Sequence, residues 1–201
     1  MMRKKKASGL TLESIRRAAL DLIDEVCIEA FSTRKLGVAL GCEAMAIYWY
    51  YPSKGALLDA VVDELMSRVG RVTSDATDSV LALREIARAY RRLAHEHPDA
   101  FPLIATRRFA TETTYGFLEG LFEIAHRQGI DDRTTARFFR AVSAYCSGIG
   151  LNEIAARRAR PAKPPPELAR LASVSKWLEP KYEDDLFEFG LDVLLAPLRA
   201  R

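Results

Sequence analysis

Three aromatic residues, Tyr48, Trp49 and Tyr50, follow one another near position 50 of the 201-residue chain. On a helix, three consecutive side chains spread over most of a turn, so they cannot all face a protein core. Cationic residues flank them, with Arg34 before and Lys54 after. Exposed aromatics bracketed by cations are suited to contact nucleic acid, because phosphate contacts set the position of a protein and base-edge contacts set its sequence preference. Burial in a core or in a protein interface is the alternative.

Two short helices joined by a glycine turn are predicted to present these side chains. Ser32 is a favourable N-cap, because its hydroxyl accepts a hydrogen bond from a backbone N–H of the first turn. Gly41 suits the left-handed conformation that ends a helix, and Pro52 pushes the residue before it toward an extended conformation. The spacing therefore predicts helices over 33–40 and roughly 44–50. This arrangement is typical of a helix-turn-helix, whose second helix enters the major groove of DNA.

Residues 11–65 resemble the DNA-binding domain of the tetracycline-repressor (TetR) family of one-component bacterial regulators. The resemblance rests on a series of motifs in chain order: a Thr-Arg pair at 33–34, a leucine-rich helix, Leu40-Gly41, Ile47-Tyr48-Trp49-Tyr50, Lys54 and Ala56-Leu57-Leu58. The sequence departs from the family pattern at Cys27, where a glycine commonly ends the first helix. It also departs at Gly55, where a helix-favouring residue is usual.

The resemblance implies a role for each matched residue. Thr33 and Arg34 match positions that contact DNA from the second helix. Tyr48 matches a phosphate-contacting tyrosine, and Lys54 matches a lysine that grips the DNA backbone. The other implied DNA contacts are Ala44, Met45 and Ala46 at the base-facing start of the recognition helix, with Trp49 and Tyr50 at the DNA surface. Because small apolar side chains make few hydrogen bonds to base edges, thymine-methyl contacts and DNA shape would carry much of the specificity.

The net charge of +3 is carried by the N-terminal quarter of the chain. Residues 1–54 hold nine Lys or Arg against six Asp or Glu, whereas residues 55–201 hold 21 of each. Four of the nine cations form a basic arm at positions 3–6, which is suited to loose contact with phosphates and expected to be disordered in the free protein. A solvated tail without function is the alternative.

Helical periodicity dominates the chain and strand alternation is nearly absent, which predicts an all-α fold. We expect three parts: a basic arm over 1–9, a three-helix domain with the helix-turn-helix over 10–54, and a larger effector-binding and dimerisation domain over 55–201. A helix at about 55–71 should link the last two. Beyond an expected loop at 73–79, helices are predicted over 80–96, 99–107, 111–128, 131–158 and 183–198, with an exposed loop at 161–166.

The last predicted helix is apolar nearly all the way round, so it must be buried on two sides. The long helix before it carries small residues that allow close approach, namely Ser143, Ala144, Ser147, Gly148 and Gly150. Together the two helices fit a four-helix homodimer interface, which the resemblance also implies. A dimer would place two DNA-binding domains about 34 Å apart, or a multiple of that distance, on a palindromic operator of double-stranded DNA. A single intrachain core is the alternative.

The resemblance further implies a cavity for an unknown small-molecule effector, which would release a repressing dimer from its operator. The aromatic and apolar candidates for this cavity are Tyr90, Phe101, Ile104, Phe109, Tyr115, Phe117, Leu118, Phe122, Phe138, Tyr145 and Trp177. Core packing is the alternative for each of them. Arg107, Arg108 and Glu112 lie where they would orient a polar ligand, with surface salt bridges as the alternative.

An enzyme is the competing class of protein, and the sequence gives it little support. His95 and His97 stand at i and i+2, which points them to different helix faces, so we expect them to cap a helix end rather than to bind a metal. Motifs of the HExxH and GxSxG types and phosphate-binding glycine loops are absent. We therefore assign no catalytic residue, metal or cofactor. A nonspecific nucleic-acid-binding protein is the other alternative.

The expected location of the protein is the cytoplasm. Three cysteines without CxxC spacing suit a reducing compartment. The charged N-terminus runs into an amphipathic helix, unlike a secretory signal, and no run approaches the ~20 apolar residues of a membrane span. No membrane partner is expected.

Overall fold

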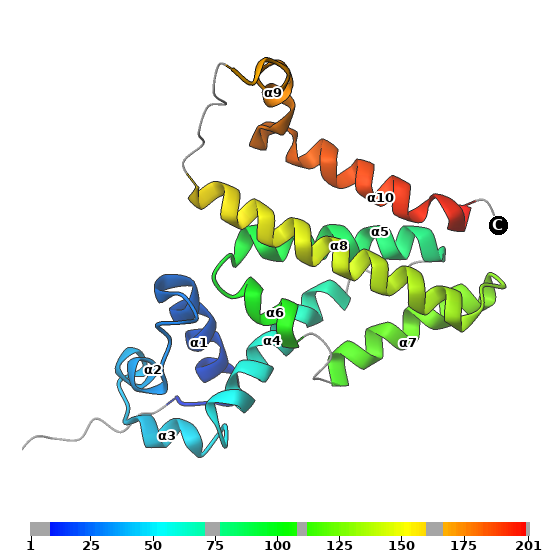
Figure 1. Ribbon diagram of the computed structural model, residues 1–201. Helices are drawn as coiled ribbons and strands as arrows, with labels where there is room; N and C mark the ends of the chain where they lie inside the picture. Colours follow the sequence, from blue (N-terminus) through cyan, green and yellow to red (C-terminus); the bar gives the residue numbers. More distant parts are fainter. Residues whose placement is uncertain (1–8, 71–76, 108–111, 160–166, 200–201) are drawn as a thin grey trace, which may run out of the picture. The chain divides into compact units, whose positions relative to one another are not determined.

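The computed structural model describes residues 9–70, 77–107, 112–159 and 167–199. These residues form ten α-helices and two 3-10 helices, with no β-strand among them, so the predicted all-α fold is confirmed (Figure 1). Contacts divide the chain into two units. Unit 1 comprises residues 1–71 and 97–117, and unit 2 comprises residues 72–96 and 118–201.

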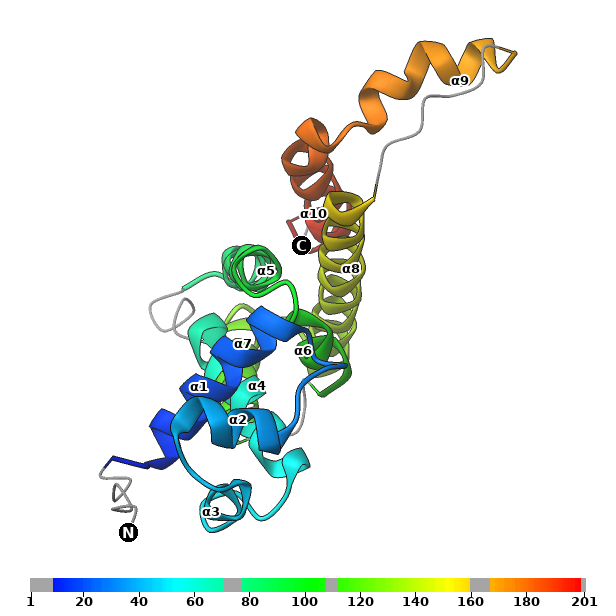
Figure 2. The ribbon, with the colours of Figure 1, turned by 90° about the vertical axis from the view of Figure 1, so that its left-hand side faces the viewer.

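Unit 1 contains the predicted three-helix domain and two further helices. Helices α1 (Leu12–Val26), α2 (Thr33–Leu40) and α3 (Ala44–Tyr48) precede α4 (Lys54–Gly70) and α6 (Phe101–Arg107). Helix α2 lies between α1 and α3 in both views (Figures 1 and 2), and α4 packs on α1 and α6. The core of this unit is made of fully buried apolar side chains, including Ile15, Ala19, Ile23, Leu36, Ile47, Leu57, Val61, Leu65 and Ile104.

Helix α1 is well capped at its start and strained at its end. At the start, a capping box joins Thr11 and Ser14, each side chain accepting a hydrogen bond from the backbone N–H of the other, at 3.0 and 2.9 Å. At the end, Cys27 adopts φ 65° and ψ 158°, a region that side chains with a Cβ rarely occupy. The residue that departs from the family pattern is therefore also a strained one.

Polar contacts hold the two sequence segments of unit 1 together. His97 Nδ1 lies 2.6 Å from Asp24 Oδ2 at the end of α1, and His97 Nε2 lies 3.2 Å from Arg68 Nη1 on α4. On α6, Arg107 forms an ion pair of 2.5 Å with Asp59 of α4. The salt-bridge alternative for Arg107 is thus what the structure shows, while Arg108 lies outside the described residues.

Unit 2 is built on three helices that lie side by side, α5 (Ser79–Glu96), α8 (Asp132–Arg158) and α10 (Glu183–Arg199) (Figure 1). Helix α7 (Glu112–Arg127) begins in unit 1 and continues into unit 2. Before α10, the chain forms α9 (Ala169–Val174) and two 3-10 helices, η2 (Ser175–Leu178) and η3 (Pro180–Tyr182). We did not predict these three short elements. The predicted loop at 161–166 lies outside the described residues.

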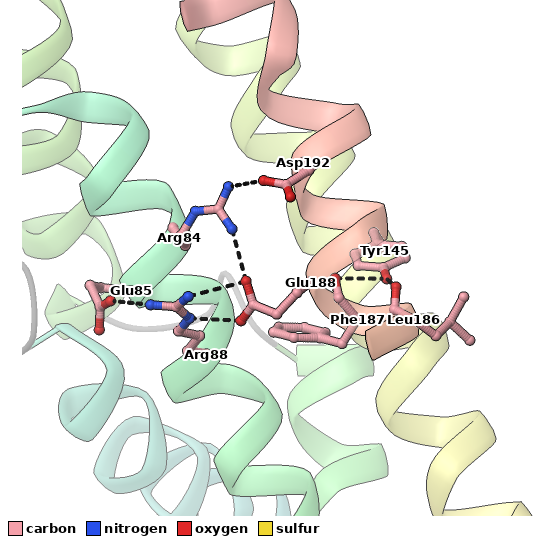
Figure 3. A network of polar contacts seen from close by, with 8 residues as sticks. All are labelled: Arg84, Glu85, Arg88, Tyr145, Leu186, Phe187, Glu188 and Asp192. Carbon is pink, nitrogen blue, oxygen red and sulfur yellow. Dashed lines mark hydrogen bonds and ion pairs between the residues drawn. The ribbon is translucent and has the colours of Figure 1, made fainter. Parts of the chain in front are cut away.

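Ion pairs join α5 to α10 (Figure 3). Arg84 donates to Glu188 Oε2 at 2.8 Å and to Asp192 Oδ1 at 2.5 Å, and Arg88 Nε donates to Glu188 Oε1 at 2.8 Å. The hydrogen bond from Arg88, followed by its charge and the contribution of Arg84, lowers the pKa of Glu188 below its ordinary value of 4.5. The carboxylate of Glu188 is therefore ionised at neutral pH.

A second cluster of charged side chains joins α5 to α8 and is centred on a buried carboxylate. Glu153 on α8 is 2% exposed and pairs with Arg91, whose Nη2 lies 2.8 Å from Glu153 Oε1. His95 Nε2 lies 2.6 Å from Glu153 Oε2, and Arg91 also stacks its guanidinium 4.7 Å from the centroid of the Phe187 ring. Buried charges of this kind require a partner, and here α5 supplies two.

Candidate nucleic-acid interface

The turn between α2 and α3 is built as the sequence predicts. Ser32 caps α2 by accepting a hydrogen bond of 3.2 Å from the backbone N–H of Lys35. Gly41 ends the helix in the left-handed conformation, with φ 66° and ψ 30°. Because this conformation carries no Cβ penalty for glycine, the chain reverses at once and begins α3.

A second glycine makes the close approach of α2 to α3 possible, and sequence reasoning missed it. A Cβ built on Gly37 would lie 2.8 Å from the carbonyl oxygen of Cys42 and 3.1 Å from the backbone nitrogen of Ala44. Any side chain at this position would therefore push the turn away from α2. The signal in the sequence was a glycine in the middle of an eight-residue helix, where it lowers helix propensity.

Helix α3 is shorter than predicted. It ends at Tyr48, whereas the spacing predicted an end near Tyr50. The backbone N–H groups of Tyr50 and Tyr51 both bond to the carbonyl of Ile47, so the chain leaves the helix in a tight turn before Pro52. Trp49 and Tyr50 therefore lie on this turn and not on the helix.

The side chains of this segment divide between core and solvent. The side chain of Ile47, on α3, is buried, while Met45 is 67% exposed and Trp49 is 88% exposed. Tyr48 is partly exposed, and its hydroxyl lies 3.2 Å from Thr33 Oγ1 on α2. Met45, Trp49 and Tyr48 thus form an apolar and aromatic surface on one side of the helix-turn-helix. A cluster of exposed apolar and aromatic side chains of this kind is typical of a binding site.

Tyr50 and Tyr51 reach back to the start of α1. The Tyr50 hydroxyl donates to the Leu10 carbonyl at 3.0 Å, and the Tyr51 hydroxyl donates to the Leu12 carbonyl at 2.8 Å. Tyr51 is buried, and this burial raises the pKa of its phenol, against a smaller opposing effect of Arg16. We did not predict a role for Tyr51.

The cations near the turn are partly engaged within the protein. Lys54 Nζ donates to the Phe31 carbonyl at 2.9 Å and lies 5.3 Å from the centroid of the Phe31 ring. Lys35 Nζ donates to the Ala30 carbonyl at 2.9 Å. Arg34 is exposed at the start of α2. An ammonium has three donors, so both lysines keep donors for a phosphate.

The predicted ligand residues fall in both units. Phe101 and Ile104 are fully buried in unit 1, and Trp177 is exposed in unit 2. Tyr145 donates its hydroxyl to the Leu186 and Phe187 carbonyls. The other members of the set belong to unit 1 (Tyr115, Phe117) or to unit 2 (Tyr90, Leu118, Phe122, Phe138), and Phe109 lies outside the described residues. The ligand set stays a prediction.

Trp177 lines a pocket within unit 2. This pocket, of about 400 Å³, lies between α8, the two 3-10 helices and α10. Tyr182 lines it as well, with its ring centroid 5.1 Å from that of Trp177, and Phe189 lies on the α10 side. Four carboxylate residues also line the pocket, namely Glu153, Glu179, Glu183 and Asp185. Of these, Glu153 pairs with Arg91 and Glu179 pairs with Lys181. The walls thus combine aromatic rings with carboxylates, two of which are ion-paired.

The two histidines contact different carboxylates. His95, in the last turn of α5, contacts Glu153 in unit 2, and His97, just beyond this helix, contacts Asp24 in unit 1. Over the described ranges, no group of three or more His, Cys, Asp or Glu residues is placed to hold a metal ion. Burial raises the pKa of the Cys146 thiol to about 12, which keeps it protonated and a poor nucleophile at neutral pH.

No helix in the described part of the chain is long and apolar enough to span a bilayer.

Two family models match the chain. Residues 15–61 match the model described as "Bacterial regulatory proteins, tetR family", which covers most of α1, all of α2 and α3, and part of α4. Residues 77–201 match the model described as "Tetracyclin repressor-like, C-terminal domain". The first match contains the helix-turn-helix, and the second spans more than half of the chain.

Named relatives and solved structures agree with these matches. The class G tetracycline repressor protein of Vibrio anguillarum is 28% identical over 187 residues, covering 89% of each chain. The class D tetracycline repressor protein of Escherichia coli is 32% identical over 132 residues, covering 58% of this chain and 61% of the relative.

Two similar structures cover nearly the whole chain. A possible TetR family transcriptional regulator from Streptomyces coelicolor A3(2) has a TM-score of 0.78 and 26% identity, covering 94% of this chain and 99% of that one. A variant of TetR from Acinetobacter baumannii AYE in complex with minocycline has a TM-score of 0.75 and 25% identity, covering 96% and 98%.

Proposed function

Because the chain belongs to the TetR family of bacterial regulatory proteins, we propose that it is a repressor that binds a palindromic operator as a homodimer and is released by a small molecule. The observation that carries the DNA-binding half is the exposed surface of Met45, Tyr48 and Trp49 beside the Gly41 turn. In a helix-turn-helix, side chains at and around the second helix are the ones that contact DNA. Such a regulator acts in the cytoplasm, where bacterial DNA lies.

The DNA contacts of the proposal follow the predicted set. Thr33 and Arg34 reach DNA from α2, and Ala44, Met45 and Ala46 face the bases from the start of α3. Tyr48, Trp49, Tyr50 and Lys54 contact the backbone. Support comes from the exposure of Arg34, Met45 and Trp49 and from the bond between Thr33 and Tyr48, which joins the two helices of the motif.

The dimer is supported by the second face of α10. Phe187, Leu191 and Leu195 are buried within unit 2, while Phe189 is 64% exposed and Val193 is 58% exposed on another face of the same helix. On the adjacent α8, Leu151 and the small residues Ala144 and Gly148 are exposed as well. Exposed apolar and small side chains on two adjacent helices suit a four-helix contact with a second copy. Two of the small residues in the predicted set are not on the exposed face: Gly150 is buried within the chain, and the Ser147 hydroxyl lies 3.2 Å from that of Tyr90 on α5.

The small-molecule step is supported by the relatives. Several are named tetracycline repressor proteins, and the Acinetobacter baumannii structure holds minocycline. Operator and effector disfavour each other reciprocally, by a coupling of about 1–3 kcal/mol. We assign the protein no reaction of its own.

Selection from random double-stranded DNA with the full chain tests this function. We expect recovery of one inverted repeat, with half-sites spaced for two DNA-binding domains. Recovery of fragments without a shared sequence would contradict the proposal and support a nonspecific nucleic-acid-binding protein. The recovered repeat, labelled and bound to the protein, then serves to screen compounds for release.

A further inference from the structure

Helix α3 is too short to hold its own orientation. The structure describes all five of its residues, and among them Ile47 is the only one with a buried side chain. The N-cap residue, Glu43, makes no capping hydrogen bond with its side chain. Helices shorter than about 12 residues are marginally stable on their own. Contacts with neighbouring elements must therefore hold α3 in place.

The proposed base-facing residues make a fixed orientation important. Two of the three, Ala44 and Ala46, carry only a methyl group. A methyl group cannot extend toward a base edge that has shifted, as a long side chain can. Binding residues need to be held within about 0.5 Å of their productive geometry. The sequence preference of this helix thus depends on what fixes its two ends.

Adjacent α2 holds α3 from one side. The backbone N–H of Cys42 donates to the Gly37 carbonyl at 2.9 Å, and the missing side chain of Gly37 lets Ala44 approach the backbone of α2 closely. At the last residue of α3, the Tyr48 hydroxyl lies 3.2 Å from Thr33 Oγ1. These contacts tie α3 to α2 alone.

Two tyrosine hydroxyls fix the end of α3 to α1. The Tyr50 hydroxyl donates to the Leu10 carbonyl and the Tyr51 hydroxyl to the Leu12 carbonyl, at 3.0 and 2.8 Å. Both tyrosines are tied to the helix as well, because their backbone N–H groups bond to the Ile47 carbonyl at 3.0 Å. Movement of this end of α3 away from α1 would therefore break both hydroxyl bonds.

The two acceptor carbonyls belong to a firmly held stretch of chain. Between them, Thr11 forms the capping box with Ser14, whose hydroxyl also donates to the Gly9 carbonyl at 3.2 Å. One turn further along α1, Ile15 and Ala19 are fully buried in the core of unit 1. The start of α1 is thus a fixed support for the end of α3.

The hydroxyls of both tyrosines serve the protein and not the DNA. Tyr51 is only 7% exposed, too little for a DNA contact of its own. A tyrosine hydroxyl has a single hydrogen, and that of Tyr50 is donated to the Leu10 carbonyl. Because a phosphate oxygen only accepts hydrogen bonds, Tyr50 has no hydrogen left for it. The ring of Tyr50 is partly exposed and stays available to the DNA surface.

We propose that the hydroxyls of Tyr50 and Tyr51 set the orientation of α3, so that the buried Tyr51 determines sequence preference without touching DNA. This inference rests on the proposed DNA-binding function and adds two positioning residues to it. The pair acts through Ala44, Met45 and Ala46, because the orientation of α3 decides how these side chains meet the bases.

The test compares two affinities of the full chain at one salt concentration. One is for the operator selected from random DNA, and the other is for an unrelated duplex of the same length. The variants are Tyr51→Phe, Tyr50→Phe and the two together, which keep both rings and remove only the hydroxyls. Thr106→Val is the matched control, because it removes a hydroxyl that donates to the Pro102 carbonyl at 3.0 Å elsewhere in unit 1.

We expect operator binding to weaken by at least about threefold in Tyr51→Phe and by at least about tenfold in the double variant. Affinity for the unrelated duplex should stay at the wild-type value, so the ratio of the two affinities falls. Partial unfolding or a lost phosphate contact would lower both affinities alike and leave the ratio unchanged. Thr106→Val should keep the wild-type ratio, and all variants should melt close to the wild-type temperature.

A second comparison tests whether Tyr51 acts through the base-facing residues. In a Met45→Ala background, Tyr51→Phe should reduce operator affinity by a smaller factor than in the wild type, because the two residues then share one contribution. An equal factor in both backgrounds would contradict the positioning role.

Unchanged operator affinity in the double variant, or an equal loss for operator and unrelated DNA, would overturn the inference. The same would follow from a Thr106→Val protein with an equally reduced ratio. Failure of the proposed function itself looks different, because the wild type would then select no sequence from random DNA.

Discussion

Gly37 shows how a single missing side chain sets the geometry of the DNA-binding domain. Its Cα faces the Cys42 carbonyl across the turn, and the turn has no room for a Cβ. Gly37→Ala should therefore destabilise the protein, because a clash with backbone atoms costs about 1–3 kcal/mol and exceeds the gain in helix propensity of about 1 kcal/mol. The measurement is the melting temperature from circular dichroism, which we expect to fall.

Gly120→Ala is the matched control for this substitution. Nothing lies within 4 Å of a Cβ at Gly120, which also sits inside a helix. This variant should melt at the wild-type temperature or slightly above it. A Gly37→Ala protein that is as stable as Gly120→Ala would show that the turn has more room than the structure gives it.

Cys27 is the converse case, because it has a Cβ at a position whose backbone conformation favours glycine. At φ 65° and ψ 158° its backbone occupies a region that costs residues with a Cβ about 1–3 kcal/mol. Cys27→Gly should raise the melting temperature, because relief of strain exceeds the entropy cost of glycine, which is about 0.5–1 kcal/mol. Cys27→Ala retains the Cβ and should give no such gain; equal stabilisation by both variants would attribute the effect to removal of the thiol.

At the scale of elements, the helices with strong signals were predictable and the short ones were not. Helix α1 shows a continuous apolar stripe with Ile15, Ala19 and Ile23 buried, and α2 has a capping serine and a terminating glycine. Helix α9 has neither signal, because none of its residues is buried within the chain. Without a buried face there is no periodic pattern from which to predict a helix.

The residues of the proposed site could be identified in the sequence, whereas most of the hydrogen bonds that they form could not. The exposure of Trp49 follows from three consecutive aromatics that cannot share one face. The bonds from Tyr50 and Tyr51 to Leu10 and Leu12 join residues about 40 positions apart, and no local pattern encodes such a pairing. The same holds for His97 and Asp24, which lie in different sequence segments of unit 1.

The ion pairs between α5 and α10 predict how the stability of the folded state changes at acidic pH. Arg88 and Arg84 lower the pKa of Glu188, so this carboxylate stabilises the folded state fully above its ordinary pKa of 4.5. Its contribution is lost as the pH falls from that value through the lowered pKa, because the unfolded state then binds the proton more readily. Glu188 is 39% exposed, so solvent screening limits the contribution to about 0.2–1 kcal/mol.

Melting temperatures of the wild type and of Glu188→Gln across pH 7 to about pH 3 test this sign. The wild type should be the more stable protein at pH 7, and the difference should vanish in acid. Glu119→Gln, at an exposed position of α7, is the control and should show a small difference that does not depend on pH. A stability difference between the wild type and Glu188→Gln that grows as the pH falls would contradict the assignment.

At the scale of the whole molecule, the proposed binding to a palindromic operator requires two copies of the chain. Phe189→Glu places a charge in the exposed apolar face of α10 and should convert the dimer to a monomer in light scattering, because burial of an unpaired charge is costly. Operator affinity should fall with it, since one short helix reads only a few base pairs. Leu81→Glu, at an equally exposed leucine of α5, should leave both the mass and the affinity unchanged. A dimeric Phe189→Glu protein would move the interface elsewhere.

The most direct test of the central claim, that the exposed surface around α3 binds a specific operator, is the operator affinity of Trp49→Ala. Trp49 is 88% exposed, so its removal should not affect folding or dimerisation. We predict binding weaker by at least about 100-fold, or about 2.8 kcal/mol, while Leu81→Ala binds as the wild type does. A dimeric Trp49→Ala protein that binds the operator with wild-type affinity would contradict the account.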